Sequence, residues 1–192
     1  MLWVGEFLPH GLLRGPVISR YCVPMNALTI DIRPAEPNDA IAVAEVHRAS
    51  WQHSYAGILP YKTLRAMIER RNGHWWQRAI RGSTSILVLD VGGVIAGYAT
   101  LGLNRARSLP QEGEIYELYL LPEFQGIGLG KRLFTETRRL LESLGCKGTV
   151  VWCLEDNEQA LAFYRACKGR DIAEGAEVFE GQPVRKLAFI WP

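Results

Sequence analysis

The order of apolar and polar residues along the chain predicts alternating strands and helices. Apolar runs and period-two alternation predict strands at 28–32, 86–91, 94–103, 114–121 and 149–154, and a final hairpin over 178–191. Apolar residues three and four apart predict helices at 40–54, 61–70, 128–144 and 157–167, with a shorter helical stretch at Trp75 and Trp76. Gly92-Gly93 predicts a tight hairpin, and Gly145 predicts a helix C-terminus.

This order of elements predicts the fold class. Apart from the stretch at Trp75, it reads β-α-α-β-β-β-α-β-α-β-β, with hairpins and one strand–helix–strand crossover between Glu114 and Leu154. We therefore expect an α/β (α+β) fold, in which a mixed, mostly antiparallel sheet carries helices on both faces. Asn38 or Asp39 is expected to cap the helix at 40–54.

Length and composition predict an ordinary globular protein. The 192 residues suffice for one domain, and 48% of them are hydrophobic. The net charge of +2 makes no case for nucleic acid, and no apolar run is long enough to span a membrane, so neither partner is expected. Residues 28–192 are expected to form the domain.

The first 27 residues are expected to form a loose N-terminal tail. Glycines and prolines interrupt their apolar positions, and a basic segment of the secretory type is missing. Met25 stands directly before the first predicted strand, which makes it an alternative start of translation. We expect the chain to keep its stability without this tail.

The cysteines predict neither a metal site nor a disulfide framework. Cys22, Cys146, Cys153 and Cys167 form no C-x-x-C pair, and no histidine stands at ligand spacing from them. Free thiols suit a reducing compartment, so we expect a cytoplasmic protein without a metal.

The segment 118–133, LYLLPEFQGIGLGKRL, has the chemistry of a phosphate site. It runs from a strand through a glycine-rich turn into the strongest predicted helix. Gly126, Gly128 and Gly130 let the backbone approach a ligand, and the free N–H groups at a helix start attract negative charge. Neither the Walker pattern nor the dinucleotide-binding pattern fits, because the required glycine positions hold Gln125 and Lys131.

The pattern that fits is Q-x-x-G-x-G, at Gln125, Gly128 and Gly130. With it, the sequence resembles the GNAT superfamily of N-acetyltransferases over roughly 28–191. A second piece, N-x-x-A-x-x-F-Y at 157–164, is similar to the family's later helix. One departure is Lys168, which stands where family members commonly have glycine, so the helix is expected to end one residue later, near Gly169.

The resemblance implies a GNAT-like acyl-CoA N-acyltransferase fold with a bulged central strand and acetyl-CoA as cosubstrate, without a metal. It implies direct attack by a primary amine, from a small molecule or peptide, within a ternary complex. It also implies Tyr164 as the acid for the leaving thiolate, with a core aromatic as the alternative. The implied cofactor-binding residues are Leu118, Tyr119, Leu120, Gln125, Gly126, Ile127, Gly128, Leu129, Gly130, Lys131, Asn157 and Tyr164.

Two glutamates of the strand before the turn are candidate bases. Strict alternation would put Ile115 opposite Leu118, so a β-bulge between them is expected, which also agrees with the family. Glu114 and Glu117 then share the acceptor face, where a carboxylate pair can raise one pKa. The spacing of Glu114 from Gln125 resembles the family's histone-acetylating branch and ranks Glu114 first. The alternative is two solvated glutamates.

The sequence indicates less about the residues that bind the acceptor. His47, Trp51 and Tyr55 stand where the resemblance places the substrate loop, as pocket or as core residues. A non-catalytic acyl-CoA-binding sensor or interaction module remains an alternative function, as does an acyltransferase for a longer acyl group or an alcohol. The sequence does not determine the oligomeric state, and a homodimer is one alternative.

Overall fold

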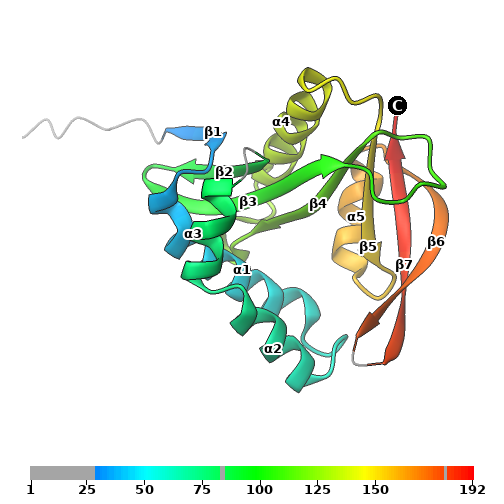
Figure 1. Cartoon of the computed structure of the whole chain (residues 1–192), viewed down its shortest axis with the longest axis horizontal. Helices are drawn as coiled ribbons and strands as arrows, with labels where there is room; N and C mark the ends of the chain where they lie inside the picture. The colour runs from blue at the N-terminus through cyan, green and yellow to red at the C-terminus, as the bar shows by residue number, and fades with distance from the viewer. Residues whose placement is uncertain (1–28, 83–84, 180) are drawn as a thin grey trace, which may run out of the picture.

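The computed structural model describes residues 29–82, 85–179 and 181–192 (Figure 1). The predicted tail at 1–27 and the alternative start at Met25 lie outside the described residues.

A seven-stranded sheet forms the centre of the molecule, in the order β1-β2-β3-β4-β5-β7-β6. Neighbouring strands are antiparallel except β4 and β5, which are parallel as the predicted crossover requires. This confirms the mixed, mostly antiparallel sheet. The strands are β1 Ile30–Pro34, β2 Ile86–Val91, β3 Val94–Leu103, β4 Gly113–Leu120, β5 Thr149–Leu154, β6 Arg170–Phe179 and β7 Gln182–Trp191.

Helices cover both faces of the sheet, because successive strand residues point to opposite sides. Leu87 and Leu89 of β2 pack in the cluster that holds α4 and α5, whereas Ile86 and Val88 pack in the cluster that holds α1 and α3. Figure 1 shows α1, α2 and α3 together, away from α4. The helices are α1 Ala40–Tyr55, α2 Tyr61–Arg70, α3 Gly73–Gly82, α4 Leu129–Ser143 and α5 Glu158–Ala166.

The predicted bulge is confirmed in β4. Leu101 of β3 pairs with Ile115, but Thr100 pairs with Glu117, so Tyr116 is the extra residue. The parallel pairing of β4 with β5 covers only Gly113–Ile115 against Thr149–Val151, so it ends at the bulge. The part of β4 that follows the bulge is therefore not paired with β5, and its edge on that side is free of ladder hydrogen bonds to β5.

The predicted helical stretch at Trp75 and Trp76 is confirmed as α3. Three other expectations about the elements were wrong in detail. β6 begins at Arg170, well before the predicted hairpin strand at 178. The first strand is Ile30–Pro34 rather than 28–32. Asp39 stands at the N-cap of α1 without capping it, because its carboxylate accepts hydrogen bonds from Arg33 and from the Glu36 N–H.

The end of α5 also differs from expectation. Lys168 itself takes the left-handed conformation, with φ of 64°, at the place where the family has glycine. Its N–H donates to the Arg165 carbonyl, and the Gly169 N–H donates to the Tyr164 carbonyl, which is the Schellman pattern. Gly169 cannot take a side chain, since an added Cβ would lie 2.5 Å from the Trp191 ring.

Candidate functional site

The glycine-rich turn has the backbone conformation that its sequence indicates. Gly126 and Gly128 have φ of 76° and 87°, a region that side chains disfavour. Gly128 is the N-cap of α4, and an added Cβ at either position would meet nothing within 4 Å. The turn is therefore open above the helix N-terminus, as a phosphate site requires.

Gln125 holds the turn in place. Its amide nitrogen donates to the Leu120 carbonyl at 3.0 Å, and its amide oxygen accepts from Gln159 of α5 at 2.7 Å. The Leu120 carbonyl also accepts from the Ser50 hydroxyl at 2.8 Å. The Gln125 side chain thus joins β4, the turn and α5.

A cavity of about 440 Å³, here called the turn cavity, lies against this turn. It is bounded by the end of β4, the turn and α5. Of the cofactor-binding residues expected from the sequence, all line it except Ile127, which is exposed, and Leu129, which packs in the core.

Asn157 and Tyr164 both line the turn cavity from α5. Asn157 caps this helix, since its side-chain oxygen accepts from the Ala160 N–H at 3.1 Å. Its amide group remains beside the cavity. Tyr164 packs among Phe134, Phe163 and other rings, and burial raises the pKa of its hydroxyl. Tyr164 is therefore both a core aromatic and a cavity residue.

A second cavity of about 850 Å³, here called the aromatic cavity, lies on the α1–α3 side of β4. Trp51 and Tyr55 of α1 and Trp75 of α3 line it, together with Tyr119 of β4. Tyr119 lines both cavities, and its hydroxyl lies 2.7 Å from that of Tyr55. The two cavities therefore meet at β4, just beyond the bulge.

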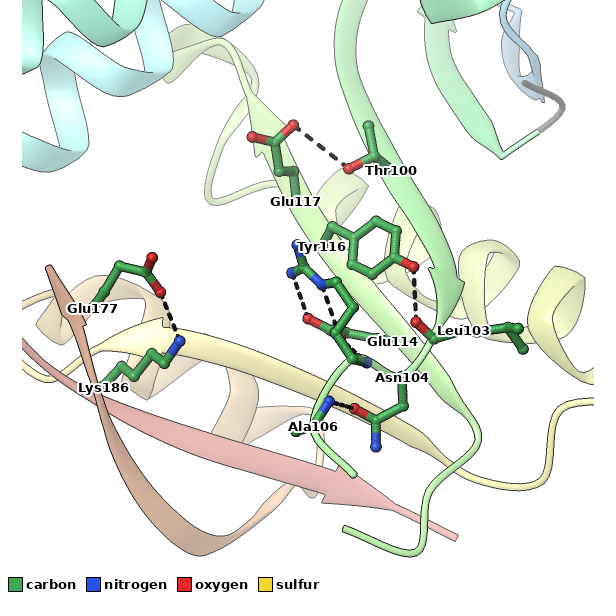
Figure 2. A network of polar contacts seen from close by, with 10 residues as sticks. Thr100, Leu103, Asn104, Ala106, Glu114, Tyr116, Glu117, Glu177 and Lys186 are labelled. Carbon is green, nitrogen blue, oxygen red and sulfur yellow. Dashed lines mark hydrogen bonds and ion pairs between the residues drawn. The ribbon is translucent and has the colours of Figure 1, made fainter. Parts of the chain in front are cut away.

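Both candidate glutamates line the aromatic cavity (Figure 2). Glu117 forms an ion pair with Arg71 and accepts from the hydroxyls of Tyr98 at 3.4 Å and Thr100 at 3.5 Å. Its pKa is raised above the ordinary value by burial, and Arg71 opposes that rise. Burial, rather than a second carboxylate, is the main cause, so the sequence argument from a glutamate pair was wrong on the cause.

Glu114 is held differently. Its carboxylate accepts from the backbone N–H of Arg105 at 2.9 Å and from the Arg105 guanidinium at 2.6 Å. That guanidinium lies 4.2 Å from the centre of the Tyr116 ring, so the bulged residue supports the pair. The Glu114 side chain is only 3% exposed.

The three residues predicted on the acceptor side do not all line the aromatic cavity. Trp51 and Tyr55 line the aromatic cavity, but His47 lies outside its wall. Nδ1 of His47 is 2.9 Å from the Tyr98 hydroxyl, and burial together with Arg71 lowers the pKa of His47 to about 3. His47 is thus a neutral residue behind Tyr98, which in turn donates to Glu117.

The sequence reading missed Arg71, Tyr98, Arg105 and the Lys186–Glu177 pair. Tyr98 and Thr100, the two hydroxyl-bearing residues of the mainly apolar strand β3, were the signal that could have been followed. Arg71 follows the end of α2, Arg105 lies in the loop after β3, and Lys186 lies within β7. The hydrophobic pattern does not indicate which carboxylate each of these cations meets. Within the described parts of the chain, no cluster of three potential ligands could hold a metal ion, and no helix could span a membrane.

Comparisons with known proteins agree with this geometry. Residues 41–168 match the acetyltransferase (GNAT) family. The uncharacterized N-acetyltransferase YuaI of Bacillus subtilis is 28% identical over 164 residues, covering 85% of this chain and 93% of that protein. The probable N-acetyltransferase Rv2775 of Mycobacterium tuberculosis is 33% identical over 147 residues, covering 73% and 79%.

A solved structure shares the fold. The PaiA N-acetyltransferase of Thermoplasma acidophilum, in complex with coenzyme A, superposes with a TM-score of 0.65 at 22% identity. The match covers 83% of this chain and 98% of that one.

Proposed function

This chain belongs to the acetyltransferase (GNAT) family and is an acetyl-CoA-dependent N-acetyltransferase, and we propose that it acetylates a primary amine of a small molecule or peptide by direct attack in a ternary complex. The observation that carries the proposal is the meeting of two cavities at Tyr119. One cavity has the chemistry of a pyrophosphate site, and the other is large and lined by aromatic rings. A sensor that only binds acyl-CoA has no use for the second cavity.

In this proposal the turn cavity binds acetyl-CoA. Backbone N–H groups from Gly126 to Lys131 hold the pyrophosphate, where the dipole of α4 and the Lys131 ammonium favour negative charge. The pantetheine arm lies along β4 from Leu118 to Leu120, at the edge that β5 leaves unpaired. A coenzyme A complex of a protein with the same fold supports this assignment.

We assign the chemistry to β4 and α5. The Leu118 N–H stabilises the carbonyl oxygen as it gains charge, and Asn157 orients the thioester end. The amine nitrogen attacks the carbonyl carbon, and the C–N bond forms as the C–S bond breaks. An ammonium acceptor loses two protons: Glu117 takes the first, and the second replaces the proton that Tyr164 gives to the thiolate.

The contacts favour Glu117 over Glu114 as the base, which reverses the order ranked from the sequence. A base must bind a proton at working pH, and burial raises the pKa of Glu117 toward that range. Glu114 accepts all three of its hydrogen bonds from Arg105, through the backbone N–H and the guanidinium, which ties its carboxylate to the loop after β3. Glu114 is better suited to hold the loop that closes the aromatic cavity.

The binding site is tested by two matched glycine substitutions. Gly128→Val places a side chain over the N-terminus of α4 and should weaken coenzyme A binding by at least about tenfold in calorimetry. Gly145→Val is the control, because Gly145 follows the other end of α4 with φ of 88° and the same open surroundings. Equal affinity of Gly128→Val and the control would remove the turn from the site.

A further inference from the structure

The carboxylates of the aromatic cavity are all matched by cations. Glu114, Glu117 and Glu177 are the acidic residues in its described wall. Arg105 pairs with Glu114 at 2.6 Å, Lys186 pairs with Glu177 at 2.7 Å, and Arg71 pairs with Glu117. Figure 2 shows Glu114 and Glu117 on β4 and the Glu177–Lys186 pair on the neighbouring hairpin.

A fourth cation of this wall has no such partner. Arg78 of α3 lines the cavity, and among the described residues no carboxylate lies within ion-pair distance of it. It follows Trp75 by three positions, so both lie on one side of α3. The Arg71 guanidinium lies 4.9 Å from the centre of the Trp75 ring. The wall therefore carries one more positive than negative charge, beside an aromatic surface.

This charge balance discriminates between classes of amine. The ammonium groups of a polyamine lose their water on binding and need carboxylates to replace it. In this cavity each carboxylate already has a cation beside it. A second ammonium group would also meet Arg78 and Arg71. An acceptor with an anionic group gains a charge-assisted hydrogen bond from Arg78 instead, because a guanidinium matches a carboxylate or phosphate geometrically.

We propose that the acceptor carries an anionic group, a carboxylate or a phosphate, besides its primary amine, and that Arg78 binds this group. The inference rests on the proposed function, since it assigns the aromatic cavity to the acceptor. The amine end lies toward Glu117 and Tyr119, where the two cavities meet, and the anionic end lies toward α3. Trp75 supplies the apolar surface between Arg71 and Arg78.

Pairs of amines that differ only in the anionic group test the proposal. Lysine with lysinamide, and a short peptide with its C-terminal amide, report on a carboxylate. Phosphoethanolamine with ethanolamine reports on a phosphate. Release of free coenzyme A is measured at equal concentrations, and the ratio of kcat/KM within each pair is compared. At least one pair should favour the anionic member about tenfold, and the pair that does so identifies the anion.

Two arginine variants test whether Arg78 causes that preference for the anionic acceptor. Arg78→Gln should lower the ratio for the favoured pair about tenfold, since the charge is lost but the length of the side chain is nearly kept. Arg81→Gln is the control, because Arg81, like Arg78, is an exposed arginine of α3 but does not line the cavity. It should leave the ratio unchanged.

The possible failures are distinguishable. Neutral members that react as fast as anionic ones, or faster, would overturn the inference and leave the acetyltransferase assignment intact. An anionic preference that Arg78→Gln and Arg81→Gln alter equally would also overturn it. If coenzyme A binds but no amine of any pair reacts, the proposed acceptor chemistry fails, and the inference fails with it.

Discussion

Glu117 and Glu114 differ in what surrounds their carboxylates. Glu117 has a raised pKa and contacts with two hydroxyl groups, and Tyr98 is itself held by His47. If Tyr98 donates to Glu117, then His47 must donate from Nδ1 to Tyr98, and its Nε2, which has no hydrogen-bond partner among the described residues, carries no proton. A buried acceptor without a partner is less costly than a buried donor, so this arrangement is consistent. The chain His47–Tyr98–Glu117 thus orients the carboxylate proposed as the base.

The pH dependence of kcat/KM separates the two glutamates. A carboxylate base acts only when ionised, so the rate should fall as pH drops through the raised pKa of Glu117, above the ordinary value of 4.5. An alkyl ammonium stays protonated below about pH 8, so the ionisation of the acceptor adds no pH dependence in that range. Glu117→Gln should abolish the decline of kcat/KM at acidic pH and lower kcat/KM about 100-fold. Glu114→Gln should keep that decline. Wild-type profiles in both variants would exclude both residues as the base.

The Tyr164 hydroxyl acts late in the proposed reaction. Tyr164→Phe keeps the ring that packs against Phe134 and Phe163, so the fold and the coenzyme A affinity should change little. Loss of the proton donor should lower kcat by about 100-fold while the Kd for coenzyme A is preserved. Rapid-quench measurement of the acetyl transfer step, alongside calorimetry, checks this. An unchanged transfer rate would leave Tyr164 with only its role in the core.

At the scale of elements, the site depends on where three of them begin or end. The bulge at Tyr116 ends the pairing of β4 with β5, the glycine turn starts α4, and Asn157 starts α5. Each is a local irregularity that exposes backbone groups a regular element would pair. The proposed cofactor site is therefore made mostly of element ends.

A substitution at the C-terminus of α5 should stabilise the protein. Lys168 holds a left-handed conformation that costs a side chain about 1 kcal/mol, whereas glycine adopts it freely. Lys168→Gly should raise the free energy of unfolding by about 0.5–1 kcal/mol and Tm by a few degrees, measured by thermal and urea unfolding. Lys168→Ala removes the same charge but keeps Cβ, so it should give no such gain. A similar gain in both variants would trace the effect to charge.

At the scale of the molecule, the two proposed substrate sites meet at one strand, β4. In the proposed reaction acetyl-CoA occupies the turn cavity while the amine occupies the aromatic cavity. Initial-velocity lines for the two substrates should therefore intersect, and incubation with acetyl-CoA alone should leave the protein's mass unchanged. Parallel lines with an acetylated protein would instead indicate a covalent intermediate.

Local chemistry was enough to predict most elements and the cofactor turn. The bounds of α2, β2, β3 and β5 match the predicted ranges, because their apolar periods are regular. Gly126 and Gly128 predicted the turn because few other residues adopt its backbone conformation. The parity of apolar residues around Ile115 predicted the bulge before any partner strand was known. These features depend on residues close together in sequence.

The tertiary structure alone decided which polar groups meet. Arg71 pairs with Glu117 across 46 positions, and His47 reaches Tyr98 across 51, so no local pattern could reveal either contact. The same long-range packing made Glu117 rather than Glu114 the better candidate for the base, and left Arg78 without an ion-pair partner in the described cavity wall. The sequence by itself therefore determined the fold and the cofactor turn, whereas packing determined the ionisation and the charge of the acceptor side, because burial and distant partners set both.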